Sequence, residues 1–99
     1  MLTHIVLIRL HDDTTPEQAD SLVAGLRALP GKILAIGTYA VERDLGLAAG
    51  NHEVAIVARF ASPEDLRAYV EHPAHRAAVR DLIVPLSSER ARIQIPDLA

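Results

Sequence analysis

The sequence predicts an α+β fold whose elements follow the order β-α-β-β-α-β. Four segments have the β-branched, apolar or alternating character of strands, at residues 4–10, 33–43, 53–60 and 89–95. Between them, two segments begin with helix N-terminal signatures and continue with apolar residues at helical spacing. The 99 residues leave no room for a second core of ordinary size, so we expect a single domain over residues 1–99.

The strand segments differ in character. Residues 4–10, His-Ile-Val-Leu-Ile-Arg-Leu, are almost continuously apolar, which is typical of a strand buried on both faces. The segment 33–43 is expected to be weaker because it contains Gly37, and residues 45–51 are expected to form a hairpin loop. The last segment alternates apolar with polar residues: Ala91, Ile93 and Ile95 against Arg90, Arg92 and Gln94.

Both helices have a recognisable beginning. Thr15-Pro16-Glu17-Gln18 has the pattern of a capping box with proline at the first helical position. That helix is expected to end at Pro30-Gly31. Ser62-Pro63-Glu64-Asp65 opens the second helix, which we expect to be interrupted at Pro73, to restart immediately and to end at Pro85.

Two helices can cover only one face of a four-stranded sheet. In the first strand, Val6, Ile8 and Leu10 share one face, whereas Ile5 and Leu7 share the other. A second apolar face on a small globular subunit usually marks an interface, and the simplest cover is the same face of a second copy. The expected architecture is therefore a ferredoxin-like subunit, with its helices on one face of a four-stranded antiparallel sheet, that forms a homodimer through the open face.

Composition narrows the classes of partner. The net charge is −3 and three residues are aromatic, so no nucleic-acid partner is expected. No apolar run approaches the roughly 20 residues of a bilayer span, and the first residues lack a signal-peptide pattern, so we expect no membrane partner and a cytoplasmic location. Without cysteine, thiolate chemistry and disulfides are excluded. The chain has five histidines, the residue type that can accept and donate protons near neutral pH: His4, His11, His52, His72 and His75.

Three segments resemble a known family, in the right order along nearly the whole chain. They are His4-Ile5-Val6-Leu7, Leu29-Pro30-Gly31-Lys32-Ile33 and Tyr69-Val70-Glu71-His72-Pro73-Ala74-His75. Together they resemble the stress-responsive dimeric α/β-barrel family, Dabb. The resemblance implies a dimeric α/β barrel and a small-molecule ligand. Most members have no assigned activity, but one plant member closes a linear polyketide by aldol condensation, in a pocket between sheet and helices.

The resemblance also implies a site. The tyrosine and the catalytic histidine of the plant cyclase fall on Tyr69 and His75, and its strand histidine falls on His4. The residues expected to bind substrate are Val6, Ile8 and His72. The first helix is shorter here and lacks the large aromatic residues of the cyclase, so the pocket and its substrate should differ.

The chemistry of these residue types fits a reaction that forms an enolate. Such a step needs a base with a pKa near the working pH and a donor that faces the developing oxyanion. His75 suits the first role, Tyr69 the second, and His4 can orient or relay a proton. We therefore expect cofactor-free cyclase, isomerase or lyase-type chemistry on a small carbonyl compound.

Other interpretations of the same residues remain open. A protein that binds a ligand without converting it, or a structural protein, would also bury Tyr69 in a core stripe and use His72 to cap the restarted helix. No metal site is expected, because His72 and His75 are three residues apart and Pro73 disturbs the helix between them. A haem site would need an aimed axial histidine and a large apolar cleft, neither of which the sequence shows.

Overall fold

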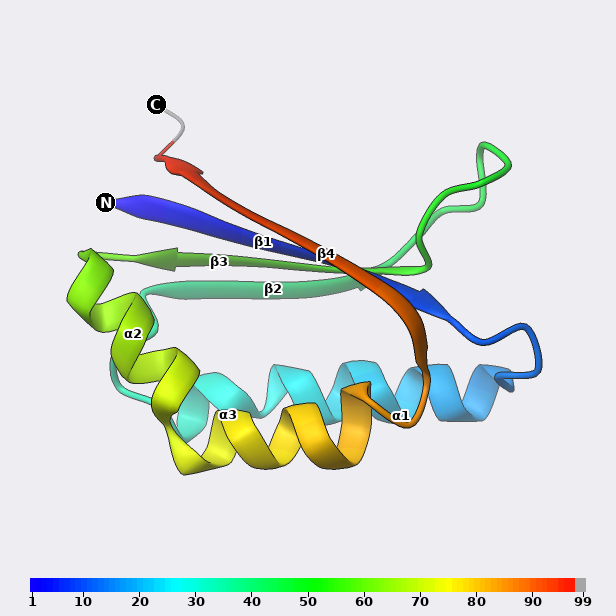
Figure 1. Ribbon diagram of the computed structural model, residues 1–99, viewed down its shortest axis with the longest axis horizontal. Coiled ribbons are helices and arrows are strands. Elements are labelled where there is room, and N and C mark those ends of the chain that lie inside the picture. Colours follow the sequence, from blue (N-terminus) through cyan, green and yellow to red (C-terminus); the bar gives the residue numbers. More distant parts are fainter. Residues whose placement is uncertain (98–99) are drawn as a thin grey trace.

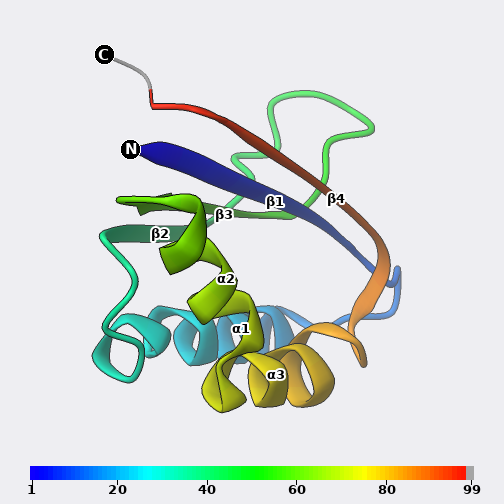
Figure 2. The ribbon, with the colours of Figure 1, turned by 60° about the vertical axis from the view of Figure 1, so that its left-hand side comes forward.

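The computed structural model describes residues 1–97 and confirms the ferredoxin-like fold (Figure 1). Its elements, in chain order, are β1 (Leu2–Leu10), α1 (Pro16–Arg27), the 3₁₀ turn η1 (Leu29–Gly31), β2 (Thr38–Arg43), β3 (Val54–Phe60), α2 (Pro63–Glu71), α3 (Pro73–Ala78), the π-helical turn η2 (Val79–Ile83) and β4 (Ser87–Pro96). The strands form one antiparallel sheet in the order β2-β3-β1-β4. All helices lie on one face of this sheet (Figure 2).

Both helix N-termini are capped as the sequence predicts. The Thr15 hydroxyl accepts a hydrogen bond from the Gln18 amide at 3.1 Å, and the Gln18 side chain accepts one from the Thr15 amide at 2.9 Å. At α2, the Ser62 hydroxyl accepts from the Asp65 amide at 3.2 Å. The interruption before Pro73 is also confirmed, because His72 has extended dihedral angles (φ −64°, ψ 137°), which proline favours in the residue that precedes it. The chain therefore changes direction between α2 and α3.

The expected strand at 33–43 begins only at Thr38, so this prediction was wrong over its first five residues. Ile33 is buried in the core, whereas its neighbour Leu34 is fully exposed. The apolar run is thus a connection that inserts one side chain into the core. Gly37 ends it, with its amide donating to the Arg59 carbonyl at 2.9 Å; a Cβ atom at Gly37 would lie 2.8 Å from that oxygen.

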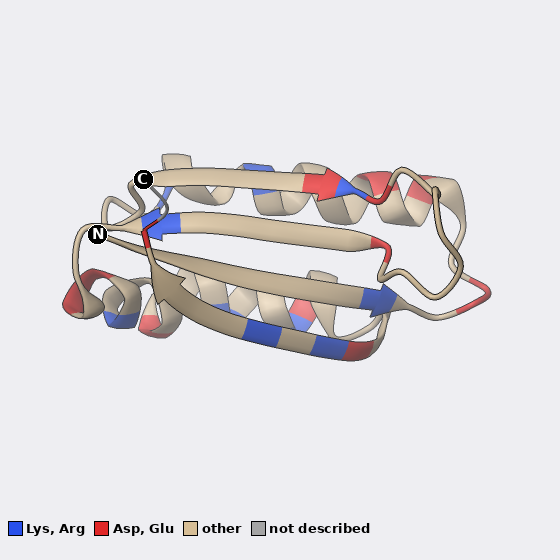
Figure 3. Cartoon of the chain, turned by 90° about the horizontal axis from the view of Figure 1, so that it is seen from above, with Lys and Arg blue, Asp and Glu red and all other residues tan. Residues whose placement is uncertain are grey.

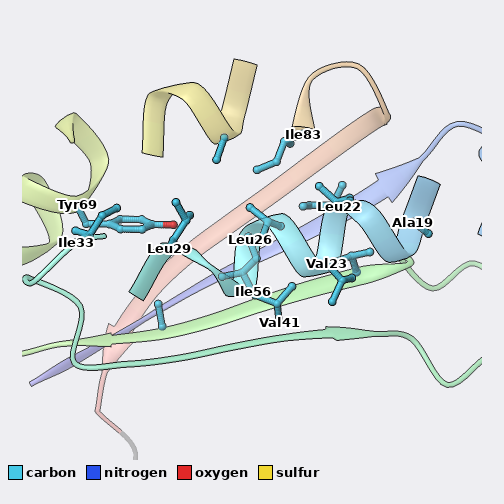
Figure 4. Close-up of a cluster of buried hydrophobic side chains, with 14 of the residues drawn as sticks. Ala19, Leu22, Val23, Leu26, Leu29, Ile33, Val41, Ile56, Tyr69 and Ile83 are labelled. Carbon is cyan, nitrogen blue, oxygen red and sulfur yellow. The ribbon is translucent and has the colours of Figure 1, made fainter. Parts of the chain in front are cut away.

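The core lies between α1 and the helix-facing side of the sheet (Figure 4). Helix α1 contributes Ala19, Leu22, Val23 and Leu26, all buried, and the sheet contributes Ile8, Val41, Val54 and Ile56, among others. Burial of this kind supplies most of the stability of a small domain. Within residues 1–97 no helix is both long enough and apolar enough to cross a bilayer.

The opposite face of the sheet is apolar at its centre. Strand pairing places Val57, Ile5 and Ile93 in one row across β3, β1 and β4. Of these, Val57 is 39% and Ile93 55% exposed, and Leu7 on the same face is 37% exposed. Figure 3 looks down on this open face and shows most charged residues toward the strand ends. The arginines within β4, Arg90 and Arg92, pair with helix-facing Ile8 and Val6 and therefore belong to the other face. An apolar centre with a charged rim has the anatomy of a protein interface.

A candidate acid–base site between the sheet and the second helical segment

A cavity of about 1040 Å³ separates β1 and β4 from the α2–α3–η2 segment. Aliphatic residues of both layers make up much of its wall, including Val6, Ile56, Leu66, Val79 and Ile83. Its polar residues are His4, Tyr69 and His75, together with side chains of β4. An apolar cavity with a few convergent polar groups is the usual form of a small-molecule site.

The polar end of the cavity is organised by one row of the sheet. Cross-strand pairing aligns Tyr39, Ala58, His4 and Gln94 on β2, β3, β1 and β4. Ala58 is small and fully buried, so the two ring-bearing residues stand on either side of it. Tyr69 reaches this row from α2, with its ring centroid 6.2 Å from that of His4 and 6.0 Å from that of Tyr39.

Two phenols meet above this row. The hydroxyl oxygens of Tyr39 and Tyr69 lie 3.0 Å apart, and either can be the donor. Burial raises the pKa of both phenols, although the hydrogen bond from Tyr39 lowers that of Tyr69 in part. Both are therefore neutral at pH 7 and keep their protons. When Tyr39 donates to Tyr69, the Tyr69 O–H is left to donate to a ligand in the cavity.

His75 packs against the Tyr69 ring at a centroid distance of 4.3 Å. Its Nδ1 lies 3.0 Å from the Val70 carbonyl oxygen. Because a carbonyl only accepts, Nδ1 carries the hydrogen, and the neutral ring keeps a free lone pair on Nε2. Burial lowers the pKa of His75, while the bond to Val70 opposes this in part. The ring is thus held as a neutral base at physiological pH.

His4 is 5% exposed, and its Nδ1 accepts a hydrogen bond from the Gln94 side-chain nitrogen at 2.8 Å. The neutral ring therefore carries its proton on Nε2, the opposite arrangement from His75. Burial is the main reason that the pKa of His4 is lowered, and repulsion from His75, when that ring is protonated, and from Arg92 lowers it further. The site thus combines one imidazole with a free Nε2 lone pair and one with an Nε2 proton to give.

The structure brings together four of the six residues named from the sequence: His4, Val6, Tyr69 and His75 all line the cavity. Ile8 and His72 are not part of its wall. Ile8 has no exposed surface and belongs to the core beneath α1. His72 uses its Nδ1 to accept from the Ala74 amide at 3.0 Å, so its ring is turned back onto the first turn of α3 as an N-cap.

Sequence reasoning missed Tyr39 and Gln94 as members of the site. Their signal is the period of two along each strand: Tyr39 shares a face with buried Val41, and Gln94 is the cross-strand partner of His4. This signal is useful only when the pairing of the strands is known. The prediction that β2 begins at residue 33 hid the pairing of Tyr39 with Ala58. Across residues 1–97, no group of three or more histidine, cysteine, aspartate or glutamate side chains is placed to hold a metal ion.

The family model of the Stress responsive A/B Barrel Domain, Dabb, matches residues 2–96. The chain belongs to the Dabb family. A stress-response A/B barrel domain-containing protein of Arabidopsis thaliana is 30% identical over 91 residues, which are 90% of this chain and 34% of the plant protein. The Dabb chain therefore spans about a third of the length of that relative.

Solved structures show the same fold. A dimeric ferredoxin-like protein of unknown function from Thermobifida fusca is 40% identical, with a TM-score of 0.88 over 97% of this chain and 90% of its own. A hydroxynitrile lyase from Passiflora edulis is 18% identical, with a TM-score of 0.83 over 95% of this chain and 90% of its own. At that identity the second likeness shows the fold alone, whereas the first comes from a dimeric relative.

Proposed function

We propose that this Dabb protein performs cofactor-free acid–base chemistry on a small carbonyl compound bound in the cavity. The observation that carries the proposal is the hydrogen bond from His75 Nδ1 to the Val70 carbonyl, 3.0 Å long. It holds the ring in the tautomer whose Nε2 can accept a proton, beside a phenol that can donate to an oxyanion. Burial keeps that imidazole neutral.

The reaction that fits these groups begins at a carbon next to a carbonyl. His75 Nε2 takes the proton from this carbon, the C–H electron pair forms the enolate double bond, and the carbonyl oxygen gains the negative charge. Tyr69 donates a hydrogen bond to that oxygen, and His4 orients the substrate or relays a proton from its Nε2. In an isomerisation, the imidazolium of His75 then returns the proton to another atom of the enolate. In a ring closure, the enolate carbon instead bonds to a second carbonyl carbon of the same molecule, and the imidazolium protonates the oxygen that receives the electron pair of the broken C=O π bond. In a lyase-type cleavage, a group on the carbon next to the enolate leaves with the electron pair of its bond and takes the proton.

A second candidate is a ligand-binding protein without catalysis. Tyr69 is 1% exposed and its hydroxyl already has a partner, which also describes a tyrosine that only closes a core. One observation favours the enzyme: the cavity wall includes both Tyr69 and His75, whose rings are in contact.

Proton exchange tests the proposal without knowledge of the product. A panel of small aryl ketones and 1,3-diketones is incubated with the protein in D₂O, and loss of the α-proton signal is followed by NMR. We expect the wild type to accelerate exchange of at least one ketone. We expect His75→Ala and Tyr69→Phe to reduce that rate about 100-fold or more, which is the usual contribution of a general base or an oxyanion donor.

His11→Ala is the matched control, because His11 is exposed and lies outside the cavity wall. Folding of each variant is checked by its amide NMR spectrum. If the wild type binds ketones yet exchanges their protons no faster than buffer, the ligand-binding alternative replaces the enzyme.

The same proposal includes a homodimer through the open sheet face and a cytoplasmic location. The apolar row of Val57, Ile5 and Ile93 and the dimeric T. fusca relative support the homodimer. The second copy would cover the one face of the sheet that no helix of the described chain reaches (Figure 1).

A further inference from the structure

Two arginines of β4 form part of the cavity wall. Arg92 pairs with Val6 and Arg90 pairs with Ile8, and both of these partners face the helices. Directly paired residues of an antiparallel sheet project from the same face, so both guanidinium groups stand on the helix side of the sheet. Both line the cavity.

Neither guanidinium has a carboxylate partner among residues 1–97. Glu89 is the one acidic residue of the cavity wall, and its carboxylate accepts from His52 Nε2 at 3.1 Å. Its cross-strand partner is Arg9, so it belongs to the opposite side of the sheet. In a chain of net charge −3, this wall therefore presents two uncompensated positive charges to the cavity.

Arg92 lies close to the acid–base groups. It is two residues from Gln94, which holds His4, and same-face neighbours along a strand are roughly 7 Å apart. The effect of its charge on the pKa of His4 reports the same proximity. A molecule whose anionic end binds Arg92 would thus lie beside His4, whose ring centroid is 6.2 Å from that of Tyr69.

We propose that the cavity binds a small organic carboxylate, with Arg92 as the anchor of the carboxylate group and Arg90 as a supporting charge. A guanidinium matches a carboxylate with two parallel hydrogen bonds. The aliphatic wall formed by Val6, Leu66 and Val79 suits an aryl or alkyl body rather than a strongly hydrated inorganic anion. The inference rests on the proposed function in one respect, because only the proposed function requires the bound carboxylate to carry a carbonyl group as well.

Pairs of acids and amides test the anchor directly. The probes are phenylacetate, 3-phenylpropanoate and 4-phenylbutanoate, each compared with its neutral amide by NMR titration at pH 7. We expect at least one acid to bind about tenfold more tightly than its amide, which is the size of effect that a charge-assisted hydrogen bond produces. We expect Arg92→Gln to remove that preference and Arg92→Lys to retain part of it.

Arg67→Gln is the control, since Arg67 is exposed on α2 and does not line the cavity. Equal binding of every acid and its amide, no binding of any probe, or a preference that survives Arg92→Gln would overturn the inference. Proton exchange of the ketone panel, measured with the same protein preparations, separates the two proposals. A carboxylate preference without exchange leaves the anchor standing and removes the enzyme, whereas exchange of neutral ketones without that preference does the reverse.

Discussion

The hydroxyl groups of Tyr39 and Tyr69 lie 3.0 Å apart and join the edge strand β2 to helix α2. Both rings are largely removed from water, so this bond is the interaction that fixes the Tyr69 hydroxyl above the His4–Gln94 pair. The position of the proposed donor therefore depends on a strand that contributes no other polar group to the site. Tyr39 is a positioning residue for Tyr69.

Tyr39→Phe should separate positioning from binding. The substitution leaves the ring in place but removes the partner of the Tyr69 hydroxyl, so we expect the free energy of unfolding to fall by about 1 kcal/mol. We expect the maximal rate of α-proton exchange to fall about tenfold while the affinity for the ketone changes less, measured as kcat and KM. An unchanged kcat would contradict the positioning role.

Buried His4 and half-buried His75 predict how the free energy of unfolding depends on pH. The pKa values of His4 and His75 are lowered in the folded protein, so the unfolded chain binds more protons once the pH falls below about 6.5. The free energy of unfolding should therefore be constant with respect to these groups above that pH. It should decrease as the pH falls toward their folded pKa values. Urea unfolding between pH 7.5 and pH 5 measures this decrease.

Single substitutions assign that pH dependence. His75→Gln removes one of the two groups and should make the decrease shallower. His11→Gln is the control substitution, at an exposed histidine outside the cavity wall. An equal slope in wild type and His75→Gln would show that His75 has the same pKa folded and unfolded, which contradicts its enclosure.

The open sheet face makes a prediction about assembly. Ile93→Asp and Val57→Asp each place a charge in the apolar row, and a desolvated, unpaired charge strongly disfavours an interface. We expect both variants to shift the protein from dimer to monomer in light scattering after size exclusion. Leu34→Asp, at a fully exposed leucine outside the row, should remain dimeric. A dimer that survives both sheet substitutions would place the interface elsewhere.

Gly37 is expected to tolerate no side chain. A Cβ atom there would lie 2.8 Å from the backbone oxygen of Arg59, and a backbone atom cannot rotate away as a side chain can. Gly37→Ala should therefore lower the free energy of unfolding by about 1–3 kcal/mol, the usual cost of forcing extra atoms into a packed site. Gly31→Ala is the control, because no atom lies within 4 Å of its added Cβ, and it should be close to neutral. Thermal melts of the two variants decide the comparison.

Sequence reasoning predicted the parts of the fold that depend on local chemistry. Neighbouring residues in the sequence determine the capping box at Thr15, the cap at Ser62 and the break at Pro73, and all three are confirmed. The start of β2 could not be predicted in this way. The run from Ile33 looks like a strand, and only the close contact between Gly37 and β3 decides that pairing begins later.

For the site, the sequence predicted which residues come together but not how hydrogen bonds arrange them. His4, Tyr69 and His75 were named from resemblance and do line one cavity. The tautomers of the two histidines could not be predicted, because they are set by hydrogen bonds to Val70 and Gln94. The position of the Tyr69 hydroxyl could not be predicted either, because it is set by the hydrogen bond to Tyr39. The sequence shows Arg92 only as a polar residue of a strand that alternates apolar and polar residues. Its place on the cavity side follows from the strand register, which pairs it with Val6.

The most direct test of the account is a ¹⁵N NMR titration of the histidine side chains in the wild type and in Tyr69→Phe. The spectrum distinguishes the two ring nitrogens and reports the pKa of each imidazole. We expect His75 to be protonated on Nδ1 when neutral, to titrate below pH 6.5, and to shift when the Tyr69 hydroxyl is removed. A His75 with its proton on Nε2, or one that titrates near pH 6.5 and ignores Tyr69, would contradict the assignment of His75 as the base.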